Sequence, residues 1–254
     1  MNPLLDVSGL GKSFGGLVVA ADLTLSLRPG DRVALIGPNG AGKTTFVNLV
    51  TGALAPDCGR IALDGEDITR APETDRVRRG LVRTFQISRL FRDMSPREHV
   101  SLAILARSGR TGRLFARIPA MRDVVEEAAR LLEEFGLSGV ADRPVGEIAY
   151  GLQRLVEIAV ALALRPKVLL LDEPAAGVPH GEAHRITDAL ERLPADLAVL
   201  MIEHDMDLVF RFAERVIVLG AGRVLFEGAP DAVRADPQVR EAYLGSYAHG
   251  RRAA

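Results

Sequence analysis

The chain has 254 residues, of which 48% are hydrophobic, which is enough for one large domain with a substantial core. Its 32 basic and 33 acidic residues give a net charge of −1, so the chain as a whole does not attract nucleic acid. A single cysteine, Cys58, excludes an internal disulfide and favours a reducing compartment.

Neither a membrane span nor a secretory signal is expected. The apolar runs, such as residues 158–164, are far shorter than the ~20 residues that cross a bilayer. The first ten residues also lack a basic segment and a long apolar core. We therefore expect a cytoplasmic protein.

Two strands are predicted before residue 30. Residues 4–10 suit a first strand, and residues 22–28 (DLTLSLR) alternate polar and apolar side chains as a half-exposed antiparallel strand requires. Between them, residues 12–16 (KSFGG) predict a turn. Phe14 in this turn could stack on a base, but a core phenylalanine fits the local sequence equally well.

A glycine-rich loop follows a short apolar strand at residues 33–36. Residues 37–44 read GPNGAGKT and match G-x-x-x-x-G-K-[ST], and helical spacing begins at Thr45. This order predicts a phosphate cradle, because glycines let successive N–H groups converge on one anion at the positive end of a helix. Lys43 is expected to reach the β- and γ-phosphates, and Thr44 to bind Mg²⁺. The candidate nucleotide-binding residues of the loop are Gly37, Pro38, Asn39, Gly40, Ala41, Gly42, Lys43, Thr44 and Thr45.

The middle of the chain changes from strands to helices. Short strands are predicted at residues 59–64, 65–68 and 80–86, whereas apolar residues recur at helical spacing over residues 98–107 and 122–135. A helical subdomain is therefore inserted into an α/β frame. Its arginine-bearing loop, residues 108–119, is better explained as a solvated basic loop than as a membrane or partner contact.

The α/β pattern returns after residue 164. Alternating strands and helices imply a mostly parallel sheet covered by helices. The predicted elements are strands at 168–171 and 198–202, helices at 182–193 and 205–212, a hairpin of 216–219 with 224–226, and short helices within 230–243.

Candidate catalytic residues follow two of these strands. Asp172 and Glu173 come directly after residues 168–171, and ligands of an open parallel sheet bind beyond the carboxyl ends of its strands. Asp172 is expected to hold Mg²⁺, and Glu173 to orient or deprotonate the water that attacks the γ-phosphate. His204, after residues 198–202, can hydrogen-bond the γ-phosphate and help to position Glu173.

Together, these motifs resemble those of the nucleotide-binding subunit of an ATP-binding cassette (ABC) transporter, over essentially the whole chain. Phe14 corresponds to the family's adenine-stacking aromatic residue, and Gln86 to the glutamine that links the Mg²⁺ site to the helical subdomain. Residues 148–154 (IAYGLQR) correspond to the signature. The resemblance implies that ATP and Mg²⁺ are the cofactors, that Gln86 binds Mg²⁺ and takes part in catalysis, and that Tyr150 and Gly151 contact the nucleotide.

The resemblance also implies a fold. It predicts a single ABC ATPase domain, residues 1–254, with a RecA-like P-loop NTPase core, a mostly parallel sheet and an antiparallel β subdomain. The core would comprise residues 1–86 and 165–254, and the helical subdomain with the signature residues 87–164.

More narrowly, the chain resembles the cassettes of branched-chain amino acid importers. The features in common are AYG in the signature, EPAAG, IEHDMDLVF and the terminal EAYLG. The implied function is ATP hydrolysis that powers import of branched-chain amino acids or similar small polar solutes. Other cargoes stay open as alternatives, because cassettes that serve urea, amides or aromatic acids, or that export lipids, have similar sequences. A soluble ABC ATPase that acts on nucleic acid is a weaker alternative. A sensor that binds ATP without turnover is disfavoured by Glu173 and His204.

The family's mechanism implies several partners. Two cassettes dimerise head to tail, so that ATP lies between the phosphate cradle of one and the signature of the other. Two transmembrane permeases would dock on residues of about 87–105, with a substrate-binding protein as an indirect partner. The chain would work at the cytoplasmic face of the inner (plasma) membrane and bind no nucleic acid.

The chain departs from the family at three positions. Ala149 and Leu152 replace the serine and the glutamine of the usual LSGGQ signature, and Pro179 stands where Asp or Asn is usual. Because the serine hydroxyl that would bond the γ-phosphate is missing, we expect a heterodimer with another cassette rather than a homodimer.

Overall fold

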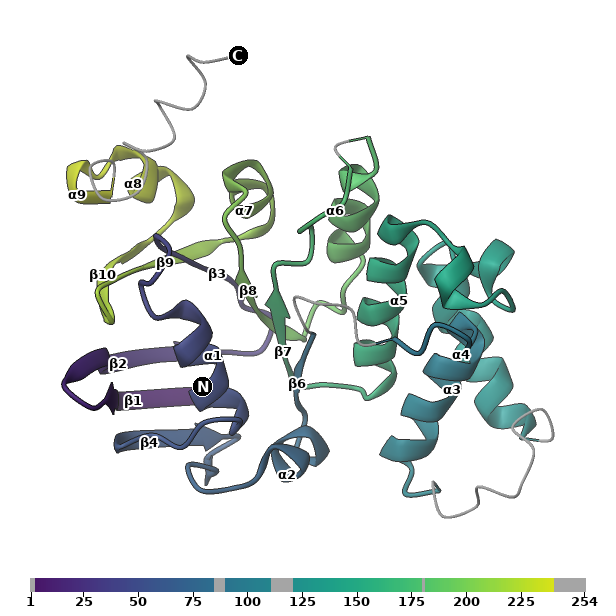
Figure 1. Ribbon diagram of the computed structural model, residues 1–254, viewed down its shortest axis with the longest axis horizontal. Coiled ribbons are helices and arrows are strands. Elements are labelled where there is room, and N and C mark those ends of the chain that lie inside the picture. Colours follow the sequence, from purple (N-terminus) through teal and green to yellow (C-terminus); the bar gives the residue numbers. More distant parts are fainter. Residues whose placement is uncertain (1–2, 85–89, 111–120, 180, 240–254) are drawn as a thin grey trace. The chain divides into compact units, whose positions relative to one another are not determined.

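The computed structural model describes residues 3–84, 90–110, 121–179 and 181–239, which fall into two compact units. The first unit comprises residues up to 81, 167–171 and those from 194, and the second comprises 82–166 and 172–193. The second unit holds the segment expected to be helical, and also residues 172–193, which the sequence analysis assigned to the core. Figure 1 labels most of the elements of both units.

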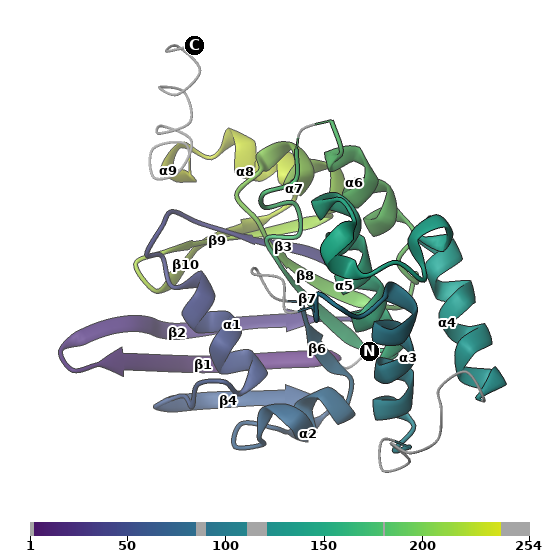
Figure 2. The same ribbon diagram turned by 45° about the vertical axis from the view of Figure 1, so that its right-hand side comes forward.

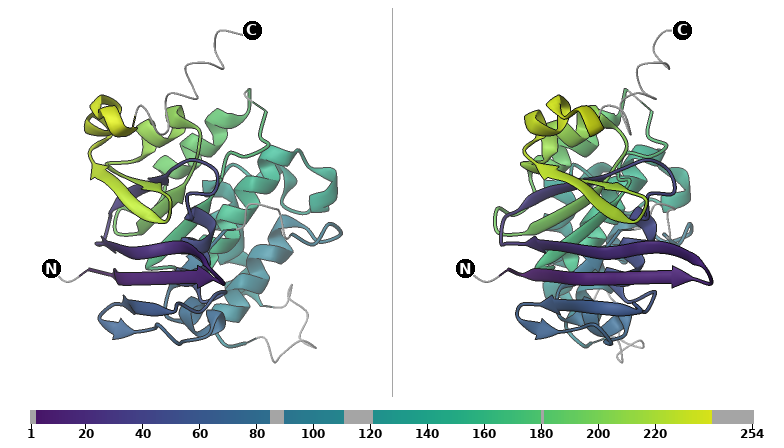
Figure 3. Two further views of the ribbon diagram at one scale, coloured as in Figure 1. Left: turned by 60° about the vertical axis from the view of Figure 1, so that its left-hand side comes forward. Right: turned by 90° about the vertical axis from the view of Figure 1, so that its left-hand side faces the viewer.

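An antiparallel sheet with strand order β2-β1-β4-β5 lies in the first unit, as predicted (Figure 3). The predicted turn at residues 12–16 is wrong in its position. The first strand continues through Phe14, which pairs with Leu17 across a two-residue Gly15-Gly16 turn, because the hairpin register carries the ladder to its tip. The strands are β1 (Leu5–Phe14), β2 (Leu17–Leu27), β4 (Cys58–Leu63) and β5 (Glu66–Asp67).

The second sheet has the strand order β10-β9-β3-β8-β7-β6. Its strand β3 pairs in parallel with both β8 and β9, whereas β10 is antiparallel to β9, so the predicted α/β sheet is confirmed. The strands β3, β7 and β8 are almost wholly buried. The bounds are β3 (Arg32–Ile36), β6 (Leu81–Arg83), β7 (Val168–Asp172), β8 (Ala198–Ile202), β9 (Arg215–Gly220) and β10 (Arg223–Gly228).

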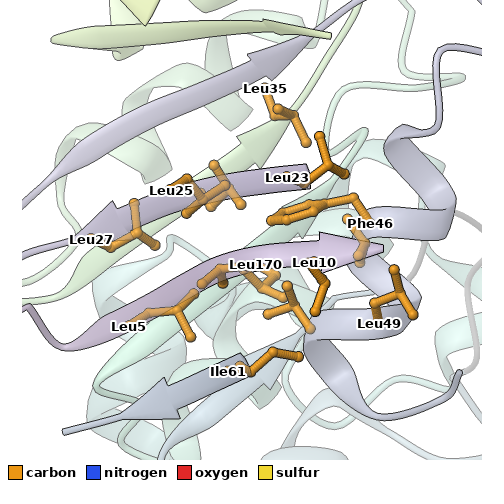
Figure 4. Close-up of a cluster of buried hydrophobic side chains, with 14 of the residues drawn as sticks. Leu5, Leu10, Leu23, Leu25, Leu27, Leu35, Phe46, Leu49, Ile61 and Leu170 are labelled. Atoms are coloured by element: carbon orange, nitrogen blue, oxygen red, sulfur yellow. The ribbon is translucent and has the colours of Figure 1, made fainter. Parts of the chain in front are cut away.

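Helix α1 (Lys43–Thr51) joins the two sheets of the first unit through one apolar core (Figure 4). Phe46 and Leu49 are fully buried among leucines of both sheets, so the helix that begins at the phosphate loop is fixed along its length. The labelled core residues are Leu5, Leu10, Leu23, Leu25, Leu27, Leu35, Phe46, Leu49, Ile61 and Leu170.

The second unit is mainly helical. Its helix α3 (Pro96–Arg107) starts with a capping box, in which the Ser95 hydroxyl accepts from the Glu98 N–H and the Glu98 carboxylate accepts from the Ser95 N–H. The predicted helices 98–107 and 122–135 are confirmed as α3 and α4 (Arg122–Glu134). The other helices of this unit are α5 (Tyr150–Ala163) and α6 (Ala183–Glu191), with short 3₁₀ turns at Ser138–Val140 and Val145–Glu147.

The remaining helices belong to the first unit and can be followed in Figure 2. They are α2 (Glu73–Arg78), α7 (Met206–Phe212), α8 (Pro230–Ala235) and α9 (Pro237–Val239). Within the described ranges, no helix combines the length and the apolar character needed to cross a bilayer.

The C-terminal end of α1 is closed by a buried arginine. Arg76 of α2 is only 1% exposed, and its guanidinium donates to the carbonyls of Leu49 (2.9 Å), Val50 (2.6 Å), Ala71 (2.9 Å) and Thr69 (2.9 Å). Burial lowers the pKa of Arg76. A cation that bonds the last carbonyls of a helix satisfies groups that have no partner within the helix, and it also complements the helix dipole. The sequence analysis predicted neither α2 nor this contact.

We predict that Arg76→Met lowers the free energy of unfolding by about 3 kcal/mol, because buried carbonyls lose their donor. Urea unfolding followed by circular dichroism measures the loss. Arg78→Met is the matched control, since Arg78 lies on the same helix with an 80% exposed side chain, and it should change the free energy of unfolding by less than about 0.5 kcal/mol. Equal midpoints for the two variants would contradict the role of Arg76.

Candidate functional site

The phosphate loop lies between the end of β3 at Ile36 and the start of α1 at Lys43, as predicted. Gly42 occupies the N-cap position with φ 101°, and no side chain of the described residues caps the helix. The first bond of α1 runs from the N–H of Phe46 to the carbonyl of Gly42 (2.8 Å). Helix geometry therefore leaves the N–H groups of Thr44 and Thr45 without an acceptor inside the helix, which suits an anion.

This loop requires glycine for two reasons: the backbone has positive φ values, and neighbouring backbone atoms leave no room for a Cβ. A Cβ at Gly42 would lie 2.7 Å from the carbonyl oxygen of Val19 in β2, and one at Gly37 would collide with the carbonyl of Leu219 in β9. The N–H of Gly222 also donates to the carbonyl of Ala41 (3.0 Å). The backbone of the loop is thus held between β2 and the β9–β10 turn.

Lys43 folds back over this loop. Its Nζ donates to the carbonyls of Gly37 (2.5 Å) and Pro38 (3.1 Å). Thr44, the next residue, is exposed. An ammonium, a row of helix N–H groups and an exposed hydroxyl form a donor set that fits the phosphates of ATP and a Mg²⁺ ion bound to them.

Phe14 ends β1 and is 52% exposed, so the alternative of a core phenylalanine is wrong. The Nζ of Lys12 lies 5.7 Å from the ring centroid. The partner strand β2 reaches the loop two residues beyond Leu17, at the Val19 carbonyl that adjoins Gly42. An exposed ring on the hairpin beside the phosphate loop is available to stack on a base.

His204 lies at the same sheet edge as the phosphate loop. In the parallel pair of β3 and β8, Leu35 is opposite Ile202, so the residues that follow the two strands emerge together. Glu203 is only 1% exposed, and its Oε2 accepts from the N–H groups of His204 (2.8 Å) and Asp205 (3.1 Å). The Nδ1 of His204 is 3.5 Å from the same oxygen, and its side chain is 60% exposed.

Glu203 was not assigned a role by the sequence analysis. The available signal was an acidic residue directly after a strand of five buried apolar residues, β8. Its carboxylate fixes the backbone that carries His204, and Asp205 in turn caps α7 by accepting from the N–H groups of Asp207 (2.9 Å) and Leu208 (3.3 Å). The histidine therefore projects from a rigid turn.

In the second unit, Asp172 ends β7 and is almost buried. Its Oδ2 is 2.5 Å from Nη2 of Arg83 in β6, and its N–H donates to Oγ1 of Thr84 (3.3 Å). Arg83 was not predicted, because an ion pair across strands leaves no pattern in the sequence. Thus the candidate metal ligand is held by both its backbone and its carboxylate.

Glu173 has a left-handed backbone, with φ 48°, immediately before Pro174. This conformation is unfavourable for a residue with a Cβ, and more so before proline. Strain of this kind persists where the surroundings impose it, and it concentrates at functional sites. It is consistent with the expected role of Glu173 as the base.

The signature segment begins α5, with Ala149 at the N-cap and no side-chain cap among the described residues. The guanidinium of Arg154 lies 5.2 Å from the ring centroid of Tyr150, and Arg154 is paired with Glu157 (2.8 Å). A Cβ at Gly177 would lie 3.2 Å from the Tyr150 ring. The signature is therefore packed against the loop that follows Glu173 in the same unit.

Several expectations fall outside the described residues. These are Gln86, residues 87–89 of the expected docking segment, residues 111–119 of the basic loop and the terminal EAYLG. Of the basic loop, Arg110 is described and pairs with Asp123 (2.5 Å). The phosphate loop, Phe14 and His204 lie in the first unit, whereas Asp172, Glu173, Tyr150 and Gly151 lie in the second.

Comparison with known proteins gives the family. Residues 20–176 match a family model described as ABC transporter, and residues 223–249 match one described as branched-chain amino acid ATP-binding cassette transporter. The chain is 41% identical to the high-affinity branched-chain amino acid transport ATP-binding protein BraF of Pseudomonas aeruginosa, over 96% of this chain and 98% of BraF. It is 40% identical to the high-affinity branched-chain amino acid transport ATP-binding protein LivG of Escherichia coli, over 96% of this chain and 98% of LivG.

Solved structures agree. An ATP-binding cassette of an ABC transporter in its ADP conformation matches with a TM-score of 0.84 and 34% identity, over 96% of this chain and 100% of that one. A nucleotide-free ATP-binding cassette from an ABC transporter matches with a TM-score of 0.83 and 33% identity, over 95% and 99%. The chain therefore belongs to the ABC transporter ATP-binding proteins of the branched-chain amino acid transporter family, and it is an ABC transporter ATPase.

Proposed function

We propose that this chain binds and hydrolyses ATP with Mg²⁺ to power import of branched-chain amino acids or similar small polar solutes. The observation that carries the proposal is the start of α1, where uncapped N–H groups, the ammonium of Lys43 and the hydroxyl of Thr44 converge in one loop. The cargo rests on the names of BraF and LivG. Cargoes of other cassettes and action on nucleic acid remain the weaker alternatives.

Each candidate residue has a distinct part in this reaction. Lys43 exchanges its bonds to the loop carbonyls for bonds to the phosphates, while the ring of Phe14 stacks on the adenine. Thr44, Asp172 and Gln86 hold Mg²⁺, which neutralises charge on the β- and γ-phosphates when bound. The Glu173 carboxylate orients the attacking water and accepts its proton, and His204 donates a hydrogen bond to the γ-phosphate.

The partners follow from the same assignment. A second cassette offers its signature to the phosphate loop of this chain, and this chain offers Tyr150 and Gly151 in return. Two transmembrane permeases dock on residues of about 87–105 at the cytoplasmic face of the inner membrane, and a substrate-binding protein delivers the cargo. The absence of a hydroxyl at Ala149 favours a heterodimer.

We predict that Glu173→Gln retains ATP binding but loses turnover by ~10²–10⁴, because an amide keeps the shape of the side chain without its basicity. Phosphate release at saturating Mg²⁺ measures turnover, and uptake of labelled leucine by cells that carry the variant measures import. Lys43→Ala should weaken nucleotide affinity instead. Hydrolysis by Glu173→Gln at the parent rate would exclude Glu173 as the base.

The strain at residue 173 leads to a separate prediction. Glu173→Gly and Glu173→Ala both remove the carboxylate, but only glycine accepts φ 48° without cost, so the glycine variant should be more stable by about 1 kcal/mol. Denaturant unfolding of the two variants gives the difference. As a control within α4, Glu133→Ala should be more stable than Glu133→Gly by about 1 kcal/mol, because alanine is favoured over glycine in a helix. The same sign at both positions would show that residue 173 is not strained.

The missing signature hydroxyl should make the two ATP sites of the pair unequal. Loss of one neutral hydrogen bond forfeits about 0.5–1.5 kcal/mol. The isolated chain should therefore be a slow ATPase, and Ala149→Ser or its cognate second cassette should raise the rate severalfold. Steady-state phosphate release measures all three preparations. Full activity of the isolated wild-type chain, with no gain from either change, would favour a symmetric homodimer.

A further inference from the structure

Asp172 already has a cationic partner within its own unit. Nη2 of Arg83 lies 2.5 Å from Oδ2 of Asp172, and the two side chains are only 11% and 8% exposed. The guanidinium of an arginine is a cation that suits a carboxylate partner. The pair is thus a nearly buried, charge-assisted hydrogen bond rather than a surface ion pair that solvent screens.

The partner strand holds Asp172 at two points. Arg83 and Thr84 are consecutive residues at the end of β6, and the hydroxyl oxygen of Thr84 accepts from the N–H of Asp172 (3.3 Å). One strand end therefore fixes both the backbone and the carboxylate of the acidic residue. This arrangement defines where the carboxylate points and which charge it faces.

A divalent cation at Asp172 has to compete with this guanidinium. A nearly buried carboxylate without a counter-charge is strongly unfavourable, so Asp172 keeps a positive partner in every state. Two cations at one carboxylate repel each other at short range in a medium of low dielectric constant. Additional negative charge, which the phosphates of a nucleotide would supply, offsets that repulsion.

In the part of the chain that the structure describes, no preformed cluster of metal ligands is available to supply that charge. Among the described residues, no group of three or more His, Cys, Asp or Glu side chains is placed to hold a metal ion. Within the described ranges, Asp172 is therefore not part of a preformed His, Cys, Asp and Glu metal cage, and the side chain that lies 2.5 Å from its carboxylate is cationic.

We propose that Arg83 is a positioning residue that serves as the counter-ion of Asp172 until Mg²⁺ replaces it, and that this exchange makes metal binding depend on bound nucleotide. The inference rests on the proposed role of Asp172 as a Mg²⁺ ligand. Arg83 orients the acidic side chain, and it opposes binding of a metal ion that arrives without phosphates.

Metal affinity tests this exchange directly. Mn²⁺ serves as the probe, with binding to the full chain followed by electron paramagnetic resonance with and without ADP, and with Mg²⁺ as competitor. Arg83→Gln should bind Mn²⁺ roughly tenfold more tightly in the presence of ADP, and should also show binding without ADP, because a competing positive charge has been removed. Arg83→Lys, which keeps the charge, should stay within about twofold of the wild type. Equal or weaker binding by Arg83→Gln overturns the proposal.

Two control variants distinguish a failure of the proposed exchange from a failure of Asp172 as a metal ligand. Arg97→Gln removes a guanidinium from another carboxylate of the same unit, Asp142 (2.7 Å), and should leave Mn²⁺ affinity unchanged. Asp172→Asn tests the underlying assignment. If this variant binds Mn²⁺ as the wild type does, Asp172 is not a ligand and the proposed function fails at this residue. If it loses binding while Arg83→Gln gains none, only the exchange is overturned.

A measurement on the wild-type chain covers the case in which Arg83→Gln does not fold. In ¹⁵N-arginine-labelled protein, the side-chain Nε–H resonance of Arg83, assigned by its loss in Arg83→Lys, should shift when Mg²⁺ is added to the ADP complex. ADP alone should leave it in place. A resonance that does not respond to Mg²⁺ overturns the exchange.

Discussion

One constraint of the first unit is that the first turn of α1 stays without a side-chain cap. A helix can satisfy its initial N–H groups with a side chain, as α3 does with Ser95 and Glu98. In α1 the N-cap is Gly42, which has no side chain, and the carbonyl of Val19 leaves no space for one. At the C-terminal end of α1, by contrast, the last carbonyls are satisfied, because the buried guanidinium of Arg76 donates to them. One helix thus carries its structural bonds at its C-terminus and keeps its N-terminus for an anion.

In the second unit, groups with proposed chemical roles are held in unfavourable states by their surroundings. Glu173 has a left-handed backbone, and Asp172 is an almost buried carboxylate that needs Arg83 and Thr84 to hold it. A chain selected for stability alone would have glycine at residue 173 and an apolar residue at 172. Local conflicts of this sort mark the places where a sequence serves a reaction rather than the fold.

The sequence predicts most of the elements and those site residues that are contiguous in a motif. The loop at residues 37–45 and the Asp172-Glu173 pair are recognisable because strand, turn and acidic residues follow one another along the chain. Arg76 and Arg83 are not recognisable, because their roles depend on partners brought close by folding, up to 89 positions away for Arg83 and Asp172. The turn at residues 12–16 was misplaced for a related reason, since the register between β1 and β2 decides where the hairpin ends.

The signature shows how a lost contact can affect a partner and leave the chain's own fold intact. Ala149 provides no hydroxyl at the start of α5, yet the helix is ordered by other means. Tyr150 packs on Gly177 and beneath the guanidinium of Arg154, which is itself paired with Glu157. These contacts lie within one unit and do not involve residue 149. The substitution therefore withdraws a donor only from whatever anion meets this helix end, so its cost is confined to the nucleotide held by the other cassette of the proposed pair.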